Sequence, residues 1–137
     1  MEKITFTPDE ANALLPQLKA DLFKLQELTT QFETEYSELQ ERKALYKEAS
    51  VQIENDPDPF FERESKLEFL KMEADMLIGN FARKGVLLKM INPGLIDFPA
   101  IVDGEEVLIC WKEGETSITH YHGWHDGFIG RKPLPEE

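Results

Sequence analysis

The 137-residue sequence predicts an α+β protein: a long antiparallel helical hairpin, coiled-coil-like in its repeat, with a small antiparallel β-sheet formed mainly by the C-terminal third. Apolar side chains recur every seven residues through most of the first 84 positions, which is typical of paired helices. After them, short β-branched and aromatic segments alternate with turn signals. The length suits a single domain, 1–137. Residues 7–84 form its hairpin, and residues 86–137 form a β subdomain with residues 3–6 as an edge strand.

The first helix begins at Thr7, whose hydroxyl can cap it while Glu10, three residues later, completes a capping box. An apolar stripe then predicts one helix of about 45 residues. Pro16 removes a backbone donor, but the stripe keeps its phase across it, which favours a bend over a break into two helices. The stripe comprises Ala11, Leu18, Leu25, Phe32, Leu39, Tyr46 and Ile53, thickened by Leu14, Leu22, Leu28, Tyr36 and Ala49.

The second helix follows a proline-rich turn over residues 54–59. Its own seven-residue repeat predicts about 25 residues lying antiparallel on the first helix, and Gly85 can take a left-handed position after its end. This helix is much shorter than the first, so residues 8–27 of the first helix lack a helical partner. We expect the sheet to cover them.

Four apolar side chains of the second helix lie off its main stripe: Phe69, Met72, Met76 and Ile78. The helix is therefore apolar around more of its circumference than a two-helix hairpin requires. Two interpretations are open. This face covers the sheet, or it joins a symmetric homodimer in which two hairpins form a four-helix bundle.

Turn signals divide the C-terminal third into four expected strands, Val86–Ile91, Leu95–Val102, Val107–Trp111 and Ile118–Tyr121. Asp103-Gly104 is typical of a two-residue hairpin turn. It predicts the pairs Val102 with Glu105, Ala100 with Val107, Phe98 with Ile109 and Ile96 with Trp111. The apolar face of this hairpin is expected to pack on the first helix.

The net charge excludes several classes of partner, and the cysteine content indicates the cellular compartment. With 15 basic and 27 acidic side chains, the net charge of -12 repels nucleic acid and anionic membranes. Cys110 is the single cysteine, so no internal disulfide is expected and a reducing, cytoplasmic location follows. We expect neither a signal peptide nor a membrane span, because no long apolar run is present.

Several short motifs are spread over nearly the whole chain. They are Phe6-Thr7, Glu10–Pro16, Gly94–Ala100, Cys110-Trp111, Gly114-Glu115, His122 and Gly127–Arg131. In this order they resemble the bacterial domain-of-unknown-function family 2203. That family has no established reaction. The resemblance therefore implies a bacterial, cytoplasmic protein but indicates no mechanism. Its polar and aromatic motif positions match Asp97, Cys110, Trp111, Glu115, His122 and Arg131.

Three histidines fall within six residues, His120, His122 and His125. On a strand His120 and His122 project from one face, and with Glu115 or Asp97 alongside they could bind zinc or another divalent transition ion. The alternative is that these histidines lie at the rim of the core and satisfy backbone carbonyls.

Cys110 is expected to pack, because no cation or helix N-terminus near it in sequence would activate a thiolate. Arg131 follows two glycines in the only locally basic spot of this region. With Trp111 it could contact an anion or a partner; otherwise Arg131 pairs with an acid and the glycines form a turn.

No residue set stands out as catalytic, and no cofactor is established. The sequence therefore predicts a non-catalytic interaction or assembly protein that dimerises through its helical hairpin, with a further protein partner as one possibility. The alternative is a divalent-metal-binding protein or a small metal-dependent hydrolase that uses the histidine cluster.

Overall fold

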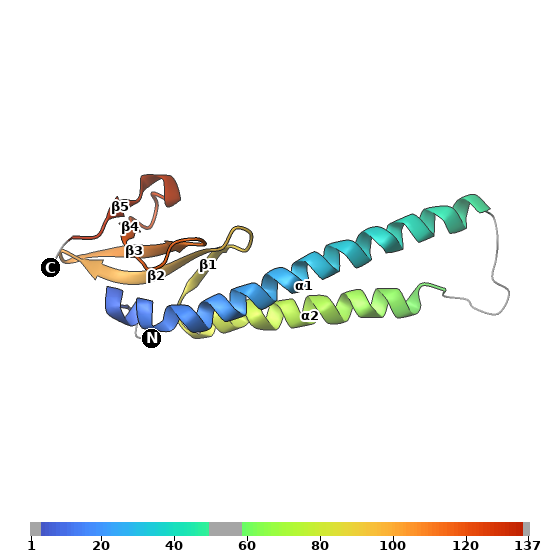
Figure 1. Ribbon diagram of the computed structural model, residues 1–137, viewed down its shortest axis with the longest axis horizontal. Helices are drawn as coiled ribbons and strands as arrows, with labels where there is room; N and C mark the ends of the chain where they lie inside the picture. The colour runs from blue at the N-terminus through green and yellow to red at the C-terminus, as the bar shows by residue number, and fades with distance from the viewer. Residues whose placement is uncertain (1–3, 50–58, 136–137) are drawn as a thin grey trace.

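A computed structural model describes residues 4–49 and 59–135. It has two long helices, α1 and α2, followed by a five-stranded antiparallel sheet, which confirms the predicted α+β fold. Figure 1 shows the sheet beside the N-terminal half of α1, far from the end where the helices turn back. The elements are α1 Pro8–Ala49, α2 Phe61–Arg83, β1 Leu87–Met90, β2 Leu95–Val102, β3 Glu105–Lys112, β4 His120–His122, the 3-10 helix η1 Phe128–Gly130 and β5 Lys132–Pro133.

The predicted capping box opens α1. The Thr7 backbone N–H donates to Glu10 Oε1 at 2.9 Å, and the Glu10 N–H donates to Thr7 Oγ1 at 3.1 Å. These bonds hold the pKa of Glu10 below its usual value. The helix then runs 42 residues without interruption through Pro16, so the alternative of two separate helices is wrong. Ile53, the last member of the predicted stripe, lies outside the described residues.

The hairpin is held by an apolar seam with ion pairs beside it. Buried Leu67, Leu70 and Phe81 of α2 face α1. Salt bridges at the edge of the seam join Lys43 to Glu64, Arg63 to Glu38 and Lys66 to Glu35. Such exposed pairs contribute on the order of 0–1 kcal/mol each, so the seam supplies most of the stability. Neither helix of the described ranges has an apolar stretch of the length that a bilayer span requires.

The sheet follows chain order, β1-β2-β3-β4-β5. All four predicted cross-strand pairs of the β2–β3 hairpin are present, and both turn residues have positive φ, 52° at Asp103 and 79° at Gly104. The short β5 and η1 were not predicted. The expected edge strand is absent from residues 4–6, where the Phe6 N–H makes one bond to the Pro99 carbonyl, because the chain turns into the helix cap at Thr7.

One face of the sheet packs on the helices, as expected. Its buried side chains form a continuous core with the N-terminal half of α1 and the C-terminal end of α2. This core contains Ala11, Leu15, Leu18, Leu22, Leu25, Phe81, Val86, Ile96, Phe98, Ala100, Val107, Ile109, Trp111 and Ile118. Because side chains alternate along a strand, the intervening residues of β2 and β3 project from the opposite face.

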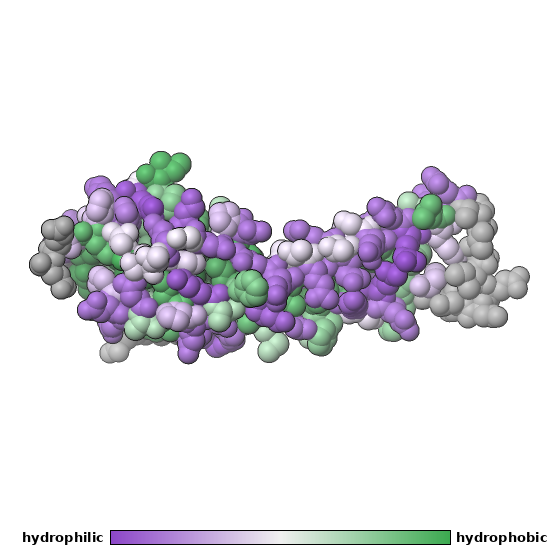
Figure 2. Space-filling view, in the orientation of Figure 1, coloured by the Kyte–Doolittle hydropathy of each residue, from purple (hydrophilic) through white to green (hydrophobic). Residues whose placement is uncertain are grey.

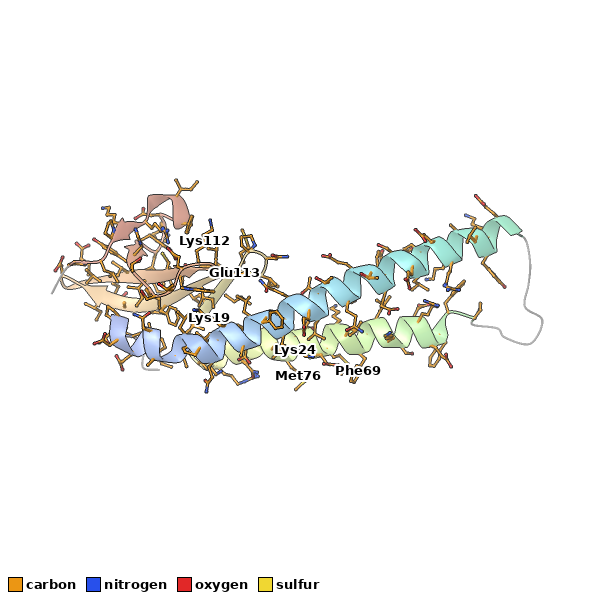
Figure 3. The ribbon with its side chains drawn as sticks, viewed as in Figure 1. Lys19, Lys24, Phe69, Met76, Lys112 and Glu113 are labelled. Carbon is orange, nitrogen blue, oxygen red and sulfur yellow. The ribbon has the colours of Figure 1, made fainter. Side chains whose placement is uncertain are left out.

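The additional apolar side chains of α2 do not cover the sheet. Phe69, Met72 and Met76 are 61%, 64% and 69% exposed, and Figure 3 shows Phe69 and Met76 pointing away from α1. The space-filling view in Figure 2 shows apolar surface along this edge of the hairpin. The interpretation that this face packs on the sheet is therefore wrong.

Gly94, in the turn between β1 and β2, lies close to Leu22 of α1. Its N–H donates to Glu113 Oε1 at 2.8 Å, and a Cβ added here would lie 2.2 Å from Cδ2 of the buried Leu22. We expect Gly94→Ala to lower the free energy of unfolding, measured in urea, by about 1–3 kcal/mol because the packed core cannot yield.

The matched control is Gly79→Ala in α2, where the added Cβ would meet only the movable end of Arg83. Alanine is the better helix former by up to about 1 kcal/mol, so this variant should lose no stability. Equal losses in Gly94→Ala and Gly79→Ala would contradict the steric explanation.

Candidate functional site

Three buried polar side chains meet on the sheet face that is turned away from the helices. Asp97 of β2 lies opposite Cys110 of β3, and His122 of β4 lies one row away, opposite Leu108. Asp97, Cys110 and His122 are only 4%, 2% and 4% exposed. A carboxylate oxygen, the sulfur and an imidazole nitrogen all lie within 4.8 Å of one another. We call these three residues the polar cluster.

Hydrogen bonds fix the orientation of the His122 ring. Its Nδ1 lies 2.8 Å from the Gly123 carbonyl oxygen, which can only accept, so Nδ1 carries a hydrogen. Its Nε2 lies 3.2 Å from Asp97 Oδ2. The atom of the ring that is turned toward Asp97 is therefore Nε2, which can share a proton or bind a cation there.

Burial sets the electrostatics of the cluster. It raises the pKa of Asp97, although the His122 imidazole acts in the opposite direction. Burial likewise raises the pKa of the Cys110 thiol, with a smaller opposing effect from Arg131. Both groups hold their protons more strongly than they would in water, and a bound cation would have to displace those protons.

Arg131 closes the cluster on the Cys110 side. Its Nη1 lies 3.9 Å from Cys110 Sγ, and its two terminal nitrogens contact the Glu115 carboxylate at 3.1 and 2.9 Å. The guanidinium also stacks 4.4 Å from the centre of the Phe128 ring. Burial alone would raise the pKa of Glu115, but the hydrogen bonds from Arg131 and from the Lys112 N–H hold it below its usual value.

The structure separates the other residues of the predicted metal site. His120 shares the face of β4, but its Nδ1 lies 2.8 Å from Thr119 Oγ1. His125 is exposed in the turn after β4, and Glu115 is bound to Arg131. None of these three belongs to the group of converging ligand atoms, whereas Asp97 and His122 do.

Trp111 lies on the other face of the sheet, in the core. Its indole N–H donates to the Glu115 backbone carbonyl at 2.8 Å, and Lys19 of α1 lies 5.3 Å from the ring centre. Trp111 is buried, and its indole supports the backbone at Glu115. Its contact with an anion or a partner stays a prediction.

Sequence reasoning missed Cys110 as a member of the site. No cation lies near Cys110 in the sequence, but in the structure Arg131 reaches Sγ from 21 residues away. One signal was present in the sequence. The hairpin register that pairs Ile96 with Trp111 and Phe98 with Ile109 also places Asp97 beside Cys110.

A family model, DUF2203, described as an uncharacterized conserved protein, matches residues 4–134. The chain belongs to the DUF2203 family. Neither curated proteins nor solved structures give a match. The motif positions that carry the family resemblance form one connected network of contacts in this DUF2203 protein: Asp97, Cys110, Trp111, Glu115, His122 and Arg131.

The Glu115–Arg131 pair predicts a pH-dependent contribution to stability. Because the folded-state pKa of Glu115 is lowered from 4.5, its contribution is fully present above that pH and is lost as the pH falls through the folded value. We expect Glu115→Gln to lower the free energy of unfolding by on the order of 1 kcal/mol at neutral pH. The difference from wild type should shrink in acid.

The matched control is Glu105→Gln at the exposed start of β3. This variant should change the free energy of unfolding by less than about 0.5 kcal/mol at any pH. Urea titrations at a series of pH values measure both variants. A Glu115→Gln difference that stays constant below pH 4.5 would contradict the assigned ion pair.

Proposed function

We propose that this protein binds one divalent transition-metal ion, of the zinc class, through Asp97, Cys110 and His122. The observation that supports the proposal is the convergence of a sulfur, an imidazole nitrogen and a carboxylate oxygen within 4.8 Å in a buried position. Zinc takes these three atom types at about 2.0–2.3 Å, and a tetrahedral arrangement would separate the ligand atoms by about 3.3–3.7 Å. Small side-chain movements would complete it.

The surroundings of the ligands favour an ion over a simple packing cluster. Metal-bound histidines usually donate their second ring N–H to a carbonyl or carboxylate, and His122 Nδ1 donates to Gly123 in this way. The Arg131 guanidinium near Cys110 Sγ opposes part of the effect of burial on the thiol pKa and in this way favours the thiolate, which is the form that binds metal. The mixed donor set of thiolate, imidazole and carboxylate suits zinc better than magnesium or calcium.

The enclosure of the site favours a structural ion over the hydrolase alternative. Three protein ligands leave one tetrahedral position, as in catalytic zinc sites. Here, however, the ligands are almost fully buried and the Arg131–Glu115 pair covers the Cys110 side. A bound water fits this position better than a substrate does. The ion would tie β2, β3 and β4 together.

The competing explanation is a buried pair in which Asp97 and His122 share a proton without a metal. It accounts for the 3.2 Å contact and for the Gly123 hydrogen bond, and it agrees with the expectation that these histidines satisfy backbone carbonyls. It gives no role to Cys110. Elemental analysis can distinguish the two explanations, because only metal binding predicts a bound ion.

Elemental analysis of protein purified without added metal should find about one zinc-class ion per chain. His122→Ala and Cys110→Ser should each lose it, because each removes a ligand. The matched controls His120→Ala and His125→Ala should keep it. No stoichiometric metal in the wild type would refute metal binding, and loss in the controls with retention in Cys110→Ser would restore the ligand set predicted from the sequence.

Thermal unfolding keeps the proposal testable if a ligand variant fails to fold. Adding zinc to chelator-treated wild-type protein should raise its Tm in a concentration-dependent way. At a zinc concentration of 100 times Kd, the free energy of unfolding should rise by about 2.7 kcal/mol. His125→Ala should respond equally. An unchanged Tm of the wild type with zinc would contradict the proposal.

A protein-interaction role is a second proposal, favoured by the exposed apolar side chains of α2. Phe69, Met72 and Met76 lie on one face of the helix and are more than half exposed. A helical surface of this kind is typical of a docking site. Self-association, which the sequence predicts, stays a prediction. Light scattering after size exclusion measures it, and a monomer at micromolar concentration would exclude the homodimer.

A further inference from the structure

The outer face of α2, defined as Phe61, Phe69, Met72 and Met76, is the feature that suggests a partner. The four side chains are each more than 60% exposed and follow helical spacing. Opposite them, Leu67, Leu70 and Phe81 make the seam with α1. Figure 3 shows Phe69 and Met76 on the side of α2 that points away from α1. The hairpin is therefore complete without this face.

Acidic side chains flank the outer face on both sides. At 100° per residue, Glu62 and Glu73 lie along one edge and Glu68 and Asp75 along the other. Glu62, Glu68 and Asp75 are exposed, and Glu73 is half-buried. Lys71 adds one positive charge beyond the second edge, and Arg83 adds another past Met76, whose backbone carbonyl accepts a hydrogen bond from Arg83 Nη2. Four acids still outnumber two cations, so the rim keeps an excess of negative charge.

Two other basic side chains of α2 are turned inward. Arg63 pairs with Glu38 at 3.7 Å, and Lys66 pairs with Glu35 at 2.8 Å. Both acids belong to α1, so these two cations are engaged at the edge of the seam and the four rim acids outnumber the cations near the outer face.

This charge distribution decides between possible occupants. If a second copy packed on the outer face, acidic rims would meet in either orientation, since both copies carry the same charges, and each chain has a net charge of -12. A helix with basic flanks would instead place Lys or Arg against the acidic rim. Charge complementarity therefore favours a basic partner over a second copy.

We propose that the outer face of α2 docks a basic amphipathic helix of a partner protein, with an apolar stripe against Phe69, Met72 and Met76. The face runs from Phe61 to Met76, about 22 Å at 1.5 Å per residue, which matches a partner helix of about 15–18 residues. Flexible methionine side chains adapt to different apolar surfaces. The inference deepens the interaction role and does not depend on metal binding.

Fluorescence anisotropy with labelled 18-residue peptides tests this inference on the full chain. One peptide is a basic amphipathic helix of leucine and lysine, the second is its scrambled form, and the third carries glutamate in place of lysine. We expect the first to bind one per chain, and at least about tenfold more tightly than the other two. Its binding should weaken as salt is added.

Protein variants identify the surface. Phe69→Gln, Met72→Gln and Met76→Gln combined should weaken binding of the basic peptide by at least about tenfold. The matched control combines Leu45→Gln and Ile129→Gln, two other exposed apolar positions, and should change Kd by less than about twofold. Circular dichroism confirms that each variant remains helical.

Two further variants test the charges and the independence of the site. Glu68→Gln combined with Asp75→Asn should weaken the basic peptide severalfold and reduce the salt dependence, because it removes two charges of the rim. His120→Ala, on the sheet and outside the polar cluster, should bind the peptide like the wild type.

Three outcomes would overturn the inference: equal binding of the scrambled peptide, an unchanged Kd in the triple variant, or no binding. Light scattering, which measures the oligomeric state, then distinguishes a failure of this inference from a failure of the wider interaction role. A dimer that the triple variant converts to monomer would place a second copy on the outer face. A monomer that binds no peptide would contradict both.

Discussion

The unequal lengths of the two helices are the constraint from which most of the structure follows. The longer helix has 42 residues and the shorter 23. The end of α2 lies beside Asp21 of α1, which Lys84 contacts at 3.3 Å, and α1 continues beyond that point with buried Ala11, Leu15 and Leu18. Leaving such leucines in water would cost about 1.5–3 kcal/mol for each side chain. The sheet removes this cost by packing on the same helical stripe, at the end away from the hairpin turn.

Using one face of the sheet for this purpose creates the setting of the polar cluster. Ile96, Phe98 and Ile109 point into the core, so Asp97 and Cys110 must point to the opposite face. That face would be open to water if the chain ended at β3. The segment that follows β4 returns across it, and Arg131 closes the Cys110 side. A buried carboxylate, thiol and imidazole are thereby held together away from solvent.

The two proposed roles use surfaces that the fold keeps apart. The polar cluster lies on the sheet, on the face turned away from the helices, whereas the outer face of α2 lies on the hairpin, on the side turned away from α1. An ion that tied β2, β3 and β4 together would stabilise the cap over α1 without touching the outer face. The acidic excess of the chain, -12, bears on the second role, because Glu62, Glu68, Glu73 and Asp75 of α2 lie beside the outer face that a basic partner would approach.

Local rules in the sequence determined the helices, the capping box at Thr7 and Glu10, the Asp103-Gly104 turn and the register of the β2–β3 hairpin, since each depends on neighbouring residues or on a regular period. They also placed Asp97 beside Cys110. Tertiary structure alone decided which other polar groups join them. The three-residue strand β4 is too short for periodicity to define, and it begins two residues later than predicted. Tertiary contacts give its histidines different surroundings, because His122 meets Asp97 and Cys110 whereas His120 Nδ1 lies against Thr119 Oγ1. The position of Arg131 depends on the path through η1 and β5, whose few residues are ordered by contacts with distant strands.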